Sequence, residues 1–92
     1  MIQLVLSSPF LGQALEQALR YRDVSDPVVL MQDAVVAATA PVWCERLAGV
    51  PLCVMQEDLL ARGMQGRIGM ELDMAGLINL IAEQGSPLTW AD

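Results

Sequence analysis

VVLMQD (residues 28–33) is echoed downstream by LCVMQED (residues 52–58). Each segment is an apolar run that stops at a methionine, a glutamine and an acid. Short continuous apolar runs are typical of strands buried on both faces, as in a parallel sheet whose strands alternate with helices. The echo therefore predicts two such strands. It places Gln32, Asp33, Glu57 and Asp58 at the carboxyl edge of the sheet, where open α/β folds usually carry their sites.

Strand and helix signals alternate on both sides of the echo. Strands are expected at residues 2–6, 28–31, 51–55, 70–72 and 87–90, of which the fourth is weak and the last could be an extended tail. Helices are expected at residues 33–38, 42–48 and 57–62, and after two N-caps, Ser8 and Asp73. Pro9 suits the first helical position after Ser8, and Gly85 ends the last helix.

Two of these helices carry an apolar stripe at helical spacing. The first stripe comprises Phe10, Leu11, Ala14, Leu15, Ala18 and Leu19, and the last comprises Met74, Leu77, Ile78 and Ile81. Alternating strands and helices over 92 residues predict one α/β domain, residues 1–92. Its architecture should be a three-layer α/β/α sandwich, with a mainly parallel sheet of four or five strands and right-handed crossovers.

The composition is unusually apolar for so short a chain. Apolar residues make up 54% of it and the mean hydropathy is +0.44. A small domain has little interior, so some of these side chains must lie on the surface. The surplus of apolar side chains indicates an interface with other subunits, and the chain could form a homo-oligomer when it is alone. The alternative is an apolar monomer.

The charge excludes several classes of function. Five arginines, no lysine, no histidine and eleven acids give a net charge of −6, so the chain cannot bind nucleic acid strongly by itself. Without histidine it lacks the commonest general base and metal ligand, and no cofactor or metal site is predicted. Two cysteines make no disulfide scaffold, and neither a signal peptide nor a bilayer-spanning run is recognisable. A cytoplasmic protein with reduced thiols is expected.

The acids at the carboxyl edge have two interpretations. A carboxylate pair could perform acid–base work or hold a divalent ion. Alternatively, Asp33, Glu57 and Asp58 each begin a helix and cap it by accepting backbone N–H bonds. We favour capping, because no lysine, histidine or regular ligand spacing supports the catalytic or metal reading.

The remaining candidate residues are cysteines, glycines and tryptophans. Cys53 lies mid-strand and is expected to be an inert core thiol with a raised pKa. Cys44 lies on a short helix and is the candidate for a sulfur-carrying or redox thiol, although Glu45 beside it is unfavourable for a thiolate. The glycines Gly63, Gly66 and Gly69 follow a helix and match a flexible loop better than a phosphate cradle. The tryptophans Trp43 and Trp90 could anchor an interface or close the core.

Four motifs together resemble the DsrH/TusB family. They are Ser8-Pro9-Phe10, the segment from Leu30 to Val35, the segment from Glu57 to Gly63, and Trp90, in this order and spacing. The resemblance covers essentially the whole chain, and the Asp-Leu-x-Ala-Arg-Gly segment is its most specific part. One departure is Ala34, where the family commonly has glycine.

The resemblance implies a DsrE-like three-layer sandwich and a place in a heterohexamer with TusC- and TusD-like subunits. Such a complex relays persulfide sulfur towards 2-thiouridine at the tRNA wobble position, and the TusD-like subunit carries the reactive cysteine. DsrH members of sulfur oxidisers have their own cysteine at the position of Ala18. Its absence here favours a TusB-like, non-enzymatic subunit. A DsrH-like role in sulfur oxidation and a thiol-dependent sulfurtransferase using Cys44 are the alternatives.

Overall fold

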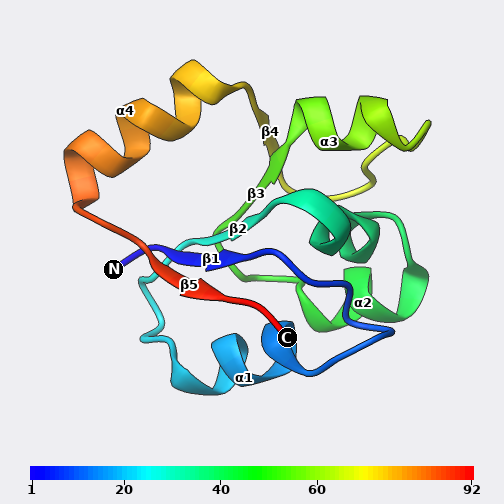
Figure 1. The fold of residues 1–92 in the computed structure, drawn as a ribbon. Helices are drawn as coiled ribbons and strands as arrows, with labels where there is room; N and C mark the ends of the chain where they lie inside the picture. Colours follow the sequence, from blue (N-terminus) through cyan, green and yellow to red (C-terminus); the bar gives the residue numbers. More distant parts are fainter.

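Five parallel strands form the central sheet of the computed structural model, which describes residues 1–92 (Figure 1). In chain order the strands are β1 (Gln3–Val5), β2 (Val28–Leu30), β3 (Leu52–Met55), β4 (Met70–Leu72) and β5 (Leu88–Trp90). Their order across the sheet is β4-β3-β2-β1-β5, and every neighbouring pair is parallel. The predicted α/β class is confirmed, and of the four or five strands expected the sheet has five.

The two echoed segments lie side by side in the sheet. In their register Val28 is opposite Leu52, Val29 opposite Cys53, and Leu30 opposite Val54. All three residues of β2 are fully buried, whereas Cys53 in β3 is only partly buried. The Met-Gln-acid endings therefore meet at one edge of the sheet, as the sequence predicted.

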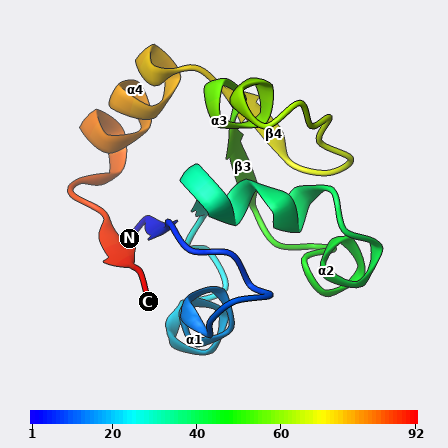
Figure 2. The same cartoon turned by 45° about the vertical axis from the view of Figure 1, so that its right-hand side comes forward.

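Helices cover the two faces of the sheet unequally. They are α1 (Ala14–Tyr21), the 3₁₀ helix η1 (Gln32–Ala38), α2 (Pro41–Arg46), α3 (Gln56–Ala61) and α4 (Met74–Gln84). Residues of the first four join one large core cluster, whereas α4 alone lies on the opposite face (Figure 2). Right-handed crossovers require this arrangement. The chain steps from β1 to β4 in one direction and then returns past β1 to β5, which reverses the side of the connecting helix.

The start of the first helix differs from the sequence prediction. Ser8 and Pro9 lie in a turn, and α1 begins only at Ala14. Phe10 and Leu11, predicted to lie on the buried stripe, are 57% and 88% exposed. The helix has a distant cap instead of a local one: the carboxylate of Asp92 accepts hydrogen bonds from the backbone N–H groups of Gln13 and Ala14, at 2.8 and 3.0 Å.

The last helix has the predicted ends but not the predicted burial. Asp73 caps α4 by accepting a 2.7 Å hydrogen bond from the N–H of Gly76, as expected. Of the predicted stripe only Leu77 is buried, while Ile81 is half-buried and Met74 and Ile78 are 41% and 59% exposed. The stripe is exposed because no second helix lies beside α4 on this face of the sheet.

A buried polar network joins Gln3 of β1 to Asp26, just before β2, and to Trp90 of β5. The side chain of Gln3 donates to the carboxylate of Asp26 at 3.2 Å and accepts from the indole N–H of Trp90 at 2.8 Å. The α-amino group of Met1 forms a 2.8 Å ion pair with Asp26. Its hydrogen bond, supported by the N–H of Asp23, lowers the pKa of the Asp26 carboxyl below its ordinary value. No buried side-chain nitrogen or oxygen is left without a hydrogen-bond partner.

Candidate functional site

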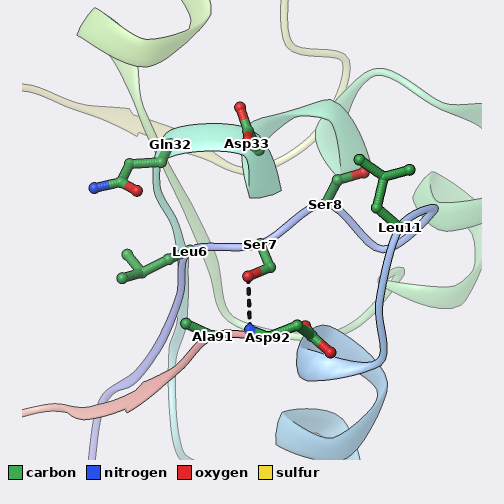
Figure 3. A pocket seen from close by; sticks show the side chains of 8 residues that line it. All are labelled: Leu6, Ser7, Ser8, Leu11, Gln32, Asp33, Ala91 and Asp92. Atoms are coloured by element: carbon green, nitrogen blue, oxygen red, sulfur yellow. Dashed lines mark hydrogen bonds between the residues drawn. The ribbon is translucent and has the colours of Figure 1, made fainter.

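A pocket of about 360 Å³ opens at the carboxyl edge of the sheet. It lies where the strand order reverses, at the ends of β1, β2 and β5, which is the usual ligand position in open α/β folds. Its lining is drawn in Figure 3: Leu6, Ser7, Ser8, Leu11, Gln32, Asp33, Ala91 and Asp92. This is the edge that the sequence singled out, although Gln32 and Asp33 are the only predicted site residues among the lining.

Most polar groups of the pocket are hydrogen-bonded to other parts of the chain. Ser7 Oγ accepts a 2.9 Å hydrogen bond from the backbone N–H of Asp92, and Ser8 Oγ accepts one from Phe10 at 3.2 Å. The Asp92 carboxylate caps α1, and Asp33 stands on the opposite side of the pocket (Figure 3). No arginine lines the pocket. The lining therefore supplies hydroxyl, amide and carboxylate groups but no cation that would bind an anionic substrate.

The two Met-Gln-acid corners are cross-linked. The backbone N–H of Gln32 donates to the carboxylate of Asp58 at 2.8 Å. Arg62 completes the link, with Nη2 2.8 Å from the Asp33 carboxylate and Nη1 3.6 Å from that of Asp58. The prediction that each acid caps its own helix is wrong for Asp33, Glu57 and Asp58, because neither η1 nor α3 has a side-chain cap.

This cross-link indicates a structural role for the two Met-Gln-acid corners. Arg62 pairs with both carboxylates and offsets one of their two negative charges, and Glu57 is exposed. Nowhere in the structure do three acidic, cysteine or histidine side chains gather in a way that could hold a metal ion. The contact of Arg62 with Asp58 was not predicted, although two oppositely charged residues spaced four apart on a helix commonly form such a pair.

The thiol of Cys44 has no activating surroundings. The side chain is half-buried on α2, and its Sγ lies 3.5 Å from the carbonyl oxygen of Ala38. The nearby cation Arg46 is engaged elsewhere, stacked on the ring of Trp43 at 4.2 Å and paired with Glu16 at 3.2 Å. Thiolate formation is promoted by a positive group, and none contacts this sulfur.

Cys53 is the second thiol and lies within the sheet. Burial raises its pKa above the ordinary thiol value, as the sequence predicted. Ala18, the position at which the resemblance places a reactive cysteine in other members, is fully buried in α1. The methyl group of Ala18 packs in the main core cluster.

The two tryptophans belong to the packed part of the molecule. Trp43 is buried in the main core cluster. Of the two roles considered for it, interface anchor or closure of the core, its position corresponds to closure of the core. Trp90 is half-buried, donates to Gln3 and lies 5.6 Å from the ring of Tyr21. Gly63, Gly66 and Gly69 lie in the loop between α3 and β4, as expected.

Comparison with known proteins assigns the chain to a family. The model of the family described as "DsrH like protein" matches residues 7–86. Protein TusB of Erwinia tasmaniensis is 34% identical over 84 residues, which cover 88% of this chain and 87% of that protein. Protein TusB of Escherichia coli O81 is 33% identical over 78 residues, or 78% and 82% of the two chains. These matches confirm the resemblance seen in the sequence motifs. Separately, the helices of the structure are all too short or too polar to span a bilayer. The chain belongs to the DsrH-like family, together with the TusB proteins.

Proposed function

We propose that the protein is a non-catalytic subunit of a cytoplasmic sulfur-relay complex, formed by one DsrH-like domain over residues 1–92. The complex passes persulfide sulfur towards 2-thiolation of the tRNA wobble uridine. TusC- and TusD-like subunits complete it, and the TusD-like subunit carries the reactive cysteine. The proposal is supported by identity of about one third to the TusB proteins over most of both chains.

The state of the two thiols supports the non-catalytic part of the proposal. A persulfide carrier needs an accessible sulfur that ionises near neutral pH. Cys53 is partly buried with a raised pKa, and the Sγ of Cys44 contacts carbonyl oxygens. The net charge of −6 is consistent with a subunit that leaves tRNA binding to a more basic partner.

The experiment that tests the proposal removes both sulfurs. Deleting the gene for this chain in its host should abolish most wobble thiolation, measured by the retardation of thiolated tRNA in mercury-containing gels. The wild-type gene should restore it, and so should a Cys44→Ser/Cys53→Ala variant. Unchanged thiolation after deletion would overturn the relay function. Failure of the variant alone, with the complex still assembled, would instead show that this chain carries sulfur on Cys44 or Cys53.

A further inference from the structure

We draw no further inference here: the strongest candidate, the exposed apolar side of α4 around Met74 and Ile78, carries none because nothing in the structure shows what covers it.

Discussion

The backbone N–H of Gln32 donates a 2.8 Å hydrogen bond to the carboxylate of Asp58. Gln32 has a φ of 53°, and it is the only residue other than glycine in the left-handed region. That conformation costs about 1 kcal/mol or more for a residue with a side chain. The bond to Asp58 offsets part of this cost and ties the ends of two neighbouring strands together.

Removing this bond should destabilise the chain measurably. We expect Asp58→Ala to lower the free energy of unfolding by about 1–2 kcal/mol, because it removes the charged acceptor of the Gln32 N–H. The exposed pair with Arg62 adds little to this figure. Glu57→Ala changes the adjacent exposed acid and should stay within about 0.5 kcal/mol of the wild type in urea unfolding. Equal effects of the two substitutions would contradict a specific role for Asp58.

Stability should fall in acid through Asp26. Because the pKa of its carboxyl is lower in the folded than in the unfolded chain, the ionised group stabilises the fold at pH values above its unfolded pKa of about 3.9. This contribution is lost as the pH falls through the still lower folded pKa. Asp26→Asn should therefore be less stable than the wild type near neutral pH, and the gap should narrow as the pH drops below about 4.

Urea unfolding over a series of pH values checks the Asp26 prediction. Asp23→Asn is the matched control, because the backbone N–H of Asp23 donates to Asp26 while its own side chain is exposed. The control should follow the wild-type pH profile. A gap between Asp26→Asn and the wild type that stays constant at every pH would refute the linkage.

Gly69 should tolerate a side chain worse than Gly49 does. Both have positive φ values, of 85° and 84°, so alanine is strained at either position by about 1–2 kcal/mol. A Cβ at Gly69 would also lie 2.9 Å from Cγ2 of Val54, whereas at Gly49 it would meet no atom within 4 Å. We expect the midpoint of thermal unfolding to fall further for Gly69→Ala. Indistinguishable midpoints would show that the backbone near β4 moves to accept the methyl group.

The thiol of Cys53 should react slowly in the folded protein. Its raised pKa leaves little thiolate near neutral pH, and partial burial limits access. In a Cys44→Ser background, iodoacetamide should label Cys53 more slowly than it labels the same chain unfolded in urea. The folded rate should rise only above pH about 8.5, the ordinary thiol value. Rapid labelling of the folded chain at neutral pH would contradict this expectation.

Local signals were sufficient for the sheet and for one helix end. The apolar runs at β2 and β3 predicted adjacent parallel strands, and Asp73 caps α4 because its partner, Gly76, is three residues away. Contacts over long sequence separation were not predictable. The cap of α1 comes from Asp92, 79 positions after Gln13, so the favourable Ser8-Pro9 pair was misread as the start of the helix.

For the candidate site, too, local features were predictable from the sequence and long-range contacts were not. Gln32 and Asp33 were correctly placed at the carboxyl edge and line its pocket. Their bonding partners were not predicted, because Asp58 and Arg62 reach them only when β2 and β3 are paired. Capping is the commonest use of an acid at the start of a helix, and it was the wrong choice here because two such corners face each other.

The distant cap of α1 has a consequence for the order in which the chain can fold on the ribosome. β1 and α1 are synthesised well before β5, yet β5 pairs with the outer edge of β1 and Asp92 satisfies the first N–H groups of α1. Until residues 88–92 emerge, β1 presents an unpaired strand edge, and the backbone groups at the start of α1 face water. The nascent chain thus stays open on this side until residues 88–92 have left the ribosome, and unpaired strand edges are prone to mispairing in that interval.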